Sequence, residues 1–267
     1  MDLELRNKRA LVTGGSRGIG KAIARELALE GASVALLARD ADRLAATASQ
    51  IANETGATIV PVVADTTDDE QVARAVAEAV AGLGGGIDIL VNAAAEPGGY
   101  AVPPPLAEIT GEFLQREIDV KVMGYLRCAR AVVPYMQAQR WGRIVNLSGL
   151  AARQTGNTVG SIRNVAVAAM AKNLADELGP CGINVTVVHP GLTRTERTAA
   201  LLQARARAQG TTEQAIERQM ADANSIRHLV DAAEVAHVVV FLASPKSVAI
   251  NGESIAAGGG APRAIHY

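Results

Sequence analysis

The chain has 267 residues, 49% of them hydrophobic, and a formal net charge of -1 at pH 7. This length is enough for one large α/β core, and the near-neutral charge argues against a nucleic-acid partner. No apolar run reaches the roughly 20 residues that span a bilayer, and residues 1–6 carry no apolar signal segment, so we expect a cytoplasmic protein without a membrane partner. Cys128 and Cys181 lack metal-ligand or redox spacing, which predicts reduced thiols and no metal site.

Short apolar runs alternate with helical stretches along the chain. The expected strands are residues 9–13, 33–38, 58–63, 87–92, 143–147, 183–188 and 254–256. The expected helices include residues 21–30, 68–81, 110–139, 165–178 and 233–242. This alternation predicts a doubly wound α/β fold, in which a seven-stranded parallel sheet has helices on both faces. Residues 1–267 contain no linker or repeat, so we expect a single domain.

A glycine-rich turn, Thr13-Gly14-Gly15-Ser16-Arg17-Gly18-Ile19-Gly20, follows the first expected strand. Gly14 and Gly18 let the backbone turn tightly and approach a phosphate, and Gly20 allows the helix to pack closely, so the helix N-terminus faces a pyrophosphate. A plain strand-to-helix turn is the alternative for this motif alone. The turn predicts a dinucleotide site, and its expected cofactor contacts are Gly14, Ser16, Arg17, Gly18, Ile19 and Gly20.

Several ordered motifs resemble those of the short-chain dehydrogenase/reductase family over nearly all of the chain. The glycine turn is similar to the TGxxxGxG loop, residues 91–95 (VNAAA) stand where NNAG is expected, and residues 189–195 (HPGLTRT) are similar to a PGxxxT segment. Asp65 ends the third strand where the family contacts adenine. The resemblance implies a Rossmann-type fold. It also implies further cofactor contacts from Asp65, Thr66, Asn92, Ala93, Ala94, Pro190, Gly191, Thr193 and Thr195.

The end of the second expected strand indicates which dinucleotide is bound. An acidic residue there bonds the ribose hydroxyls of NAD(H), whereas a cation accommodates the 2′-phosphate of NADP(H). Here Ala38 is followed by Arg39, and Arg17 can approach the same phosphate. Both arginines could instead be solvated, and Asp40 could still meet a ribose. The sequence favours NADP(H) over NAD(H).

The resemblance breaks at the positions where the family carries its Ser, Tyr and Lys. The match over residues 171–180 puts Gly160 at the Tyr position and Asn164 at the Lys position, and the Ser position falls on Gly149. The chain is therefore identified as a divergent member that lacks these residues. A slip of one residue would bring Ser148 or Ser161 into the pocket. A strand-end hydroxyl bonded to backbone is the alternative for Ser148.

Lys121 stands where the family usually has Asn, so Lys121 and Asn164 look like an exchanged pair. Burial would lower the pKa of this ammonium, which could then donate a proton or stabilise an oxyanion. The alternative is a surface lysine on an amphipathic helix. The candidate catalytic residues are Lys121, Ser148 and Asn164. Tyr100 and Tyr125 rank lower, with packing roles as the alternative.

Two main classes of function stay open. One is an NADP(H)-dependent oxidoreductase that acts on a small carbonyl or alcohol substrate with an atypical proton-transfer site; the other is a catalytically silent NADP(H)-binding protein. A lyase or isomerase that reuses the pocket is a third. Residues 194–228 are expected to cover the substrate. The resemblance of residues 110–139 and 165–178 to subunit-pairing helices implies a homotetramer or dimer.

Overall fold

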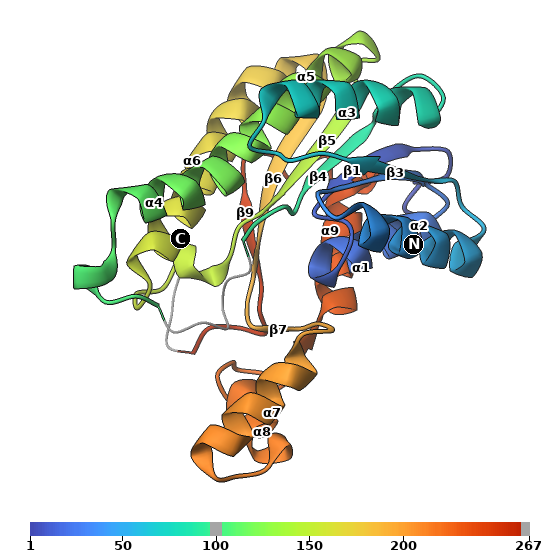
Figure 1. The fold of residues 1–267 in the computed structure, drawn as a ribbon. Coiled ribbons are helices and arrows are strands. Elements are labelled where there is room, and N and C mark those ends of the chain that lie inside the picture. The colour runs from blue at the N-terminus through green and yellow to red at the C-terminus, as the bar shows by residue number, and fades with distance from the viewer. Residues whose placement is uncertain (97–102, 263–267) are drawn as a thin grey trace.

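The computed structural model describes residues 1–96 and 103–262. Seven strands form one sheet in the order β3-β2-β1-β4-β5-β6-β9, and every pairing is parallel (Figure 1). The strands are β1 (Arg9–Thr13), β2 (Ser33–Ala38), β3 (Ile59–Val63), β4 (Ile89–Asn92), β5 (Gly142–Leu147), β6 (Ile183–Pro190) and β9 (Ser254–Ala257). The strand order reverses between β1 and β4, the place where doubly wound sheets bind ligands beyond the carboxyl ends of their strands.

Helices cover both faces of the sheet, as the alternation of elements predicts (Figure 1). One face packs on α1 (Gly18–Leu29), α2 (Ala41–Thr55) and α9 (Ala232–Ala243), and the other on α3 (Asp69–Gly82), α5 (Gly124–Ala138) and α6 (Thr158–Leu178). Within β1, Ala10 and Val12 belong to the first core and Leu11 to the second, because successive strand side chains point to opposite faces. The predicted Rossmann-type fold is confirmed.

The long helix expected over residues 110–139 is interrupted. It consists of α4 (Gly111–Ile118), a π-helical segment (Asp119–Met123) and α5. A π-helical turn inserts an extra residue into the helical ladder, and such turns are frequent at functional sites. Lys121 lies in the middle of this segment.

The segment expected to cover the substrate forms a small unit that projects from the sheet (Figure 1). β7 (Thr193–Arg194) pairs with β8 (Val230–Asp231), and between them lie α7 (Thr198–Gln209) and α8 (Glu213–Ala221). The two helices share a core of their own, made by Leu202, Ala206, Ile216, Met220 and Leu229. Among the described residues, no helix is long and apolar enough to cross a membrane.

Candidate active site

A cavity of about 820 Å³ opens beyond the carboxyl ends of the strands. Its glycine-loop end is formed by the turn after β1 together with Arg17 and Arg39, and its Lys121 end by Lys121, Ser148 and Asn164. Every predicted site residue lines this cavity except Asn92. Asn92 is buried in β4, where its Nδ2 donates a hydrogen bond to Oδ1 of Asn146 at 2.9 Å. Asn92 therefore braces β4 against β5 and does not face the cavity.

The glycine turn brings backbone segments too close together for side chains. Gly14 has a φ of +68°, and a Cβ there would lie 2.8 Å from the carbonyl oxygen of Ala93. A Cβ on Gly20 would lie 2.3 Å from the oxygen of Gly14. Only glycine fits this approach of loop, helix and neighbouring strand end. The turn thus presents bare backbone to the cavity at the start of α1, as a pyrophosphate cradle requires.

A carboxylate of the protein itself occupies the anion position at the start of α1. The N–H of Gly18 donates to Oε2 of Glu196 at 3.0 Å. α1 has no side-chain cap from Arg17 and no acidic residue in its first turn. Free N–H groups and the helix dipole favour an anion here, so Glu196 stands in for phosphate oxygens. The residues present fit the pyrophosphate of a dinucleotide.

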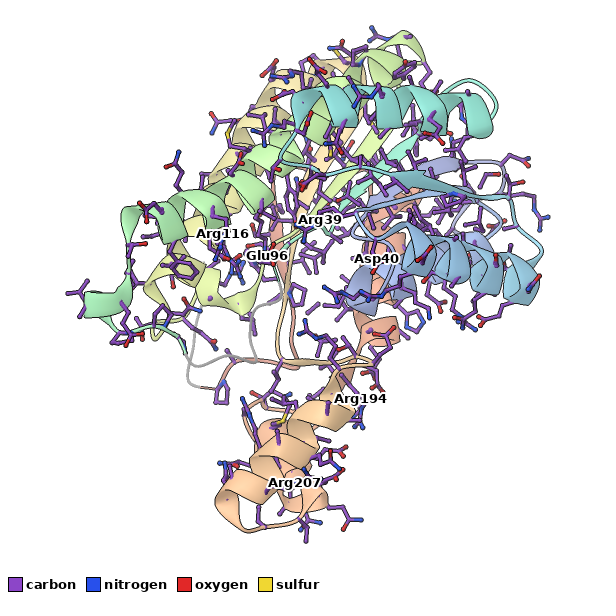
Figure 2. All side chains as sticks on the ribbon, in the orientation of Figure 1. Arg39, Asp40, Glu96, Arg116, Arg194 and Arg207 are labelled. Atoms are coloured by element: carbon purple, nitrogen blue, oxygen red, sulfur yellow. The ribbon has the colours of Figure 1, made fainter. Side chains whose placement is uncertain are left out.

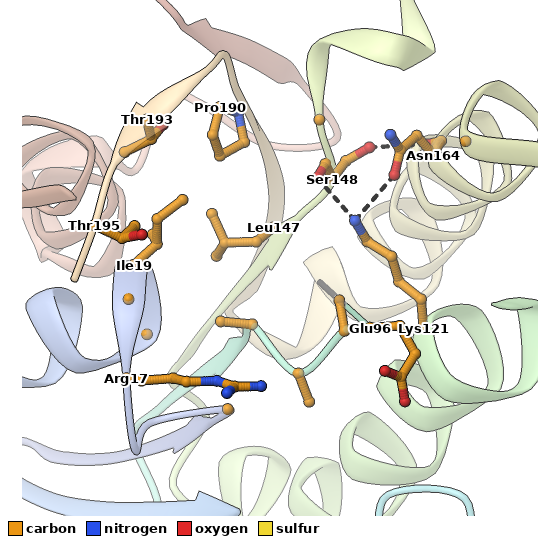
Figure 3. A pocket seen from close by; sticks show the side chains of 18 of the residues that line it. Arg17, Ile19, Glu96, Lys121, Leu147, Ser148, Asn164, Pro190, Thr193 and Thr195 are labelled. Atoms are coloured by element: carbon orange, nitrogen blue, oxygen red, sulfur yellow. Dashed lines mark hydrogen bonds between the residues drawn. The ribbon is translucent and has the colours of Figure 1, made fainter. Parts of the chain in front are cut away.

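Arginines gather at the glycine-loop end. Nη2 of Arg39 lies 3.3 Å from Glu96 (Figure 2). Nη1 of Arg39 lies 3.9 Å from Asp65. Arg17 points into the cavity and forms no ion pair with any residue that the structure describes (Figure 3). These two guanidinium groups are the cations that the sequence assigned to a 2′-phosphate.

Arg43 is a further arginine that lines the cavity, and it was not predicted from the sequence. It lies in the first turn of α2, four residues after Arg39, and this closeness along the chain was the available signal. Its Nη2 contacts Oδ2 of Asp40 at 3.1 Å, while Oδ1 of Asp40 accepts a hydrogen bond from the N–H of Arg43 at 3.0 Å. Asp40, the expected alternative ribose partner, is therefore the N-cap of α2.

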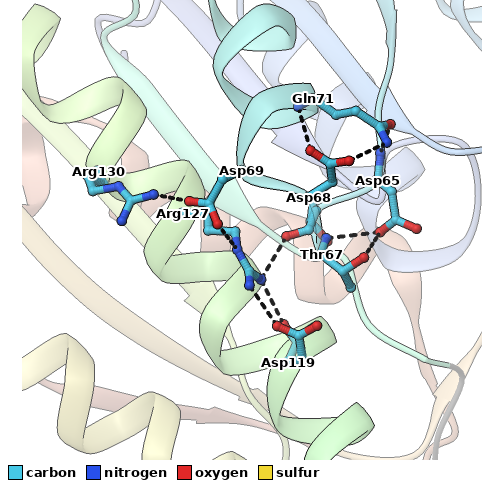
Figure 4. A network of polar contacts seen from close by, with 9 residues as sticks. Asp65, Thr67, Asp68, Asp69, Gln71, Asp119, Arg127 and Arg130 are labelled. Carbon is cyan, nitrogen blue, oxygen red and sulfur yellow. Dashed lines mark hydrogen bonds and ion pairs between the residues drawn. The ribbon is translucent and has the colours of Figure 1, made fainter.

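The loop after β3 is tied to the π-helical segment through Arg127 (Figure 4). Arg127 Nε contacts Asp69 at 3.0 Å and its Nη2 contacts Asp119 at 2.8 Å, while Nη1 donates to the carbonyl oxygen of Thr66 at 3.2 Å. In the same loop, Oδ1 of Asp65 accepts two hydrogen bonds from Thr67, each at 2.9 Å. Arg127 thus links the loop that carries the predicted contacts Asp65 and Thr66 to the segment that carries Lys121.

Lys121 is buried, with 4% of its surface exposed, so the surface-lysine alternative is wrong. Its Nζ donates to the carbonyl oxygen of Ser148 at 2.8 Å and to Oδ1 of Asn164 at 2.9 Å (Figure 3). Burial, and secondarily the charge of Arg163, lower the pKa of Lys121 to about 7, while Glu117 opposes the shift. A lysine with this pKa can give a proton as the ammonium and take one as the neutral amine near neutral pH.

A buried ion pair adjoins Lys121. Arg163 of α6 contacts Glu117 of α4, and each residue has at most 9% of its surface exposed. Arg163 also lines the cavity. Neither residue was predicted from the sequence, although Glu117 lies one helical turn before Lys121 and Arg163 directly precedes Asn164. The pair fixes α4 against α6 next to the ammonium.

The other hydroxyl candidates are engaged with backbone. Ser148 Oγ donates to the carbonyl oxygen of Asn164 at 3.0 Å, and Ser161 Oγ donates to that of Gln154 at 3.2 Å. Tyr125 is buried, its phenol donates to the carbonyl oxygen of Leu147 at 2.9 Å, and burial raises its pKa. Tyr125 therefore has the packing role. Tyr100 lies outside the described residues.

A possible metal-ligand group lies away from the cavity. The ligand atoms of His228, Asp231 and Glu234 lie within 4.8 Å of one another, in the part of the chain that the structure describes. Nε2 of His228 lies 2.8 Å from Glu234, and Asp231 pairs with Arg194 at 2.8 Å. His228 is thus already paired with Glu234, and Asp231 with Arg194.

Known proteins resemble this chain along nearly its whole length. A family profile described as Enoyl-(Acyl carrier protein) reductase matches residues 14–261. The chain is 34% identical over 254 residues to Short-chain reductase protein NovJ of Streptomyces niveus, covering 95% of this chain and 93% of that protein. It is 32% identical to 3-oxoacyl-[acyl-carrier-protein] reductase FabG of Aquifex aeolicus, covering 97% and 99%. L-sorbose reductase of Gluconobacter frateurii, solved with NADPH and L-sorbose, superimposes with a TM-score of 0.92 at 29% identity and covers 99% of this chain and 100% of that one.

Proposed function

The chain belongs to the short-chain dehydrogenase/reductase family, and we propose that it is an NADP(H)-dependent oxidoreductase that interconverts a small carbonyl compound and its alcohol. The main supporting observation is a single cavity that joins a backbone anion cradle to a buried ammonium whose pKa is about 7. A cofactor held in the cradle and a proton donor at the other end are the two things that carbonyl reduction needs.

The cofactor proposal rests on charge and backbone geometry. NADP(H), when bound, supplies or accepts the hydride. The N–H of Gly18 would donate to a phosphate oxygen in place of Glu196, and Arg17 and Arg39 would hold the 2′-phosphate. The solved structure of L-sorbose reductase, which contains NADPH, supports the same choice of dinucleotide.

Lys121 is the group that we propose moves the proton. Two of its three N–H donors are held by Ser148 and Asn164, which leaves the third for a substrate oxygen. In reduction, the ammonium gives its proton to the oxygen as negative charge develops there. In oxidation, the neutral amine takes the proton of the alcohol. Asn164 and the carbonyl group of Ser148 act by positioning Nζ.

This arrangement makes the proposed active site atypical for the family. The positions that would carry Ser, Tyr and Lys hold Gly149, Gly160 and Asn164, and none of these side chains can transfer a proton. In this proposal the ammonium of Lys121, which lies in the π-helical segment and not on α6, transfers the proton instead.

We further propose a cytoplasmic homo-oligomer, a tetramer or a dimer. Ile162 and Val165 on α6 and Met123 beside α5 are apolar side chains that are 40% or more exposed, which supports pairing of subunits through these helices. Cys128 and Cys181 are free thiols, in keeping with a reducing compartment. Sedimentation of the purified protein tests the oligomeric state.

The function is tested by measuring NADPH oxidation and NADP reduction against a panel of carbonyl compounds and alcohols, with Lys121→Ala as the comparison. We expect turnover that Lys121→Ala abolishes while NADPH still binds. Binding without turnover across the panel would favour a silent NADP(H)-binding protein. If Lys121→Ala left turnover unchanged, the protein would still be an oxidoreductase, but Lys121 would not be the group that transfers the proton.

A further inference from the structure

The side chain of Asn157 fills the space that Gly160 leaves empty. A Cβ on Gly160 would lie 2.7 Å from Cγ of Asn157, 2.8 Å from its Nδ2 and 2.9 Å from its Oδ1. These distances are shorter than any normal contact, so the amide covers the α-carbon of Gly160. Both residues line the same cavity as Lys121. The amide thus lies where a side chain at position 160 would begin.

Helix capping decides which end of this amide is available. Asn157 is the N-cap of α6, and its Oδ1 accepts a hydrogen bond from the N–H of Gly160 at 2.8 Å. With Oδ1 turned to the helix, Nδ2 is the end that remains for other partners. In the described parts of the chain, Nδ2 finds no acceptor. Asn157 therefore offers unused N–H donors, held in place by the cap, at the wall of the cavity.

The position of Lys121 relative to this amide follows from the helix. Nζ of Lys121 bonds Oδ1 of Asn164, which lies one turn after Gly160 on α6. Residues four apart on a helix share a face, with Cβ atoms about 6 Å apart. The amide of Asn157, which lies over Gly160, and the Asn164 side chain that holds Nζ of Lys121 are thus on the same side of α6, and all of them line one cavity.

We propose that Nδ2 of Asn157 is a second catalytic donor, which binds the substrate oxygen that exchanges a proton with Lys121. This inference rests on the proposed oxidoreductase function. In reduction, the carbonyl carbon gains the hydride and the C=O π pair moves to the oxygen. The oxygen takes one proton from Nζ, which leaves a neutral amine and an alcohol. Asn157 gives up no proton, because an amide does not titrate in this range; it stabilises the charge on the oxygen while it develops.

The test uses variants of Asn157 that keep the helix cap but remove the amide N–H donors. Asn157→Ser keeps a good N-cap oxygen but removes the amide N–H groups, and Asn157→Asp keeps the shape and the cap but replaces the donor by an acceptor. With the best substrate of the panel, we expect both variants to lose about 10²- to 10³-fold in kcat, the effect of deleting one oxyanion donor. Their melting temperatures and NADPH dissociation constants should stay near those of the unchanged protein.

A cap elsewhere supplies the matched control. Thr212 caps α8, where its Oγ1 accepts from the N–H of Ala215 at 3.2 Å, and it does not line the cavity. Thr212→Ala should cost about 1 kcal/mol of stability and leave kcat unchanged. Normal kcat in Asn157→Ser, with Lys121→Ala still inactive, would overturn the role of Asn157 and leave the proposed function intact. Absence of turnover by the unchanged protein would overturn the proposed function and this inference with it.

Discussion

The two ends of the cavity hold their cations in opposite ways. At the glycine-loop end, the side chain of Arg39 is 57% exposed and its carboxylate partners lie 3.3 and 3.9 Å away. At the other end, Lys121 is buried and Nζ is held by two hydrogen bonds shorter than 3 Å. Exposed cations can rearrange to meet a phosphate, whereas a buried ammonium is fixed and has its pKa lowered. Binding and proton transfer thus depend on different environments within one cavity.

Removing the buried charge is the strongest test of this contrast. Lys121→Met keeps an apolar chain of similar length but has no proton to give, so we expect kcat to fall by about 10²- to 10⁴-fold, the usual contribution of a general acid or base. Fluorescence titration should show an NADPH dissociation constant close to that of the unchanged protein, since the glycine-loop end is intact. A large loss of NADPH affinity would show that the two ends do not act separately.

The pH dependence of the unchanged protein sharpens the same point. Because the pKa of Lys121 is about 7, the ammonium that serves reduction is lost as the pH rises through 7, so kcat for reduction should fall. The neutral amine that serves oxidation appears over the same range, so kcat for oxidation should rise. Stopped-flow measurements between pH 5.5 and 9 can record both limbs. If kcat for reduction and kcat for oxidation changed in the same direction with pH, Lys121 would not be the group that transfers the proton.

The buried ion pair beside Lys121 should carry the next largest effect. Glu117→Gln leaves Arg163 charged and unpaired inside the protein, which we expect to cost about 3 kcal/mol of unfolding free energy. Glu117 raises the pKa of Lys121, so Glu117→Gln should lower this pKa. The fall in kcat for reduction should then occur at lower pH. Urea unfolding and the pH profile measure the two effects.

An exposed pair gives the control for this experiment. Lys172 and Asp176 form an ion pair at 2.7 Å on the outer face of α6, and both side chains are more than half exposed. Asp176→Asn should change stability little, because surface pairs contribute little. Equal losses from Glu117→Gln and Asp176→Asn would mean that burial of the first pair has no energetic consequence.

The glycine-loop end could be predicted from the sequence because its signals are local. Residues 9–13 and 33–38 were expected as strands and are β1 and β2 to the residue, and the glycines that make the cradle are consecutive in the chain. Arg39 was found because it directly follows β2. The helix α7 was not assigned, since its alanine, leucine and arginine residues are distributed over all of its faces and form no apolar stripe.

The Lys121 end was only partly predictable because its contacts join distant segments. The exchange of Lys121 and Asn164 was predicted from their positions in the sequence, and the two side chains are hydrogen-bonded to each other. The π-helical turn was not readable, because residues 110–139 have a continuous helical pattern. Glu196 lies 178 residues from the Gly18 N–H that it bonds, and no pattern in a single sequence links the two. The role proposed for Asn157 depends on the packing of its amide over Gly160, which only the folded structure shows.

Cofactor choice tests the exposed end with a moderate effect. Arg17→Ala and Arg39→Ala each remove one guanidinium from the proposed 2′-phosphate site, and we expect the NADPH dissociation constant to rise about tenfold, since charge-assisted bonds weaken in solvent. NADH affinity should hardly change. Arg207→Ala, an exposed arginine on α7 that does not line the cavity, is the control (Figure 2). Tighter binding of NADH than NADPH by the unchanged protein would contradict the assignment.

The smallest expected effect concerns Glu196, which joins the glycine-loop end to the covering segment. Its carboxylate accepts from the Gly18 N–H that the proposed pyrophosphate would use, so it has to leave before the cofactor is seated. Glu196→Gln weakens this competing contact by removing its charge, and both NADPH and NADH should bind about two- to fivefold more tightly, the range expected for one charge at a helix N-terminus. The equal gain separates this effect from that of Arg39, because the two dinucleotides share the pyrophosphate and differ only in the 2′-phosphate. Glu213→Gln, in the first turn of α8 and outside the cavity, should change neither constant. Weaker binding by Glu196→Gln would mean that the carboxylate supports the bound state instead of competing with it.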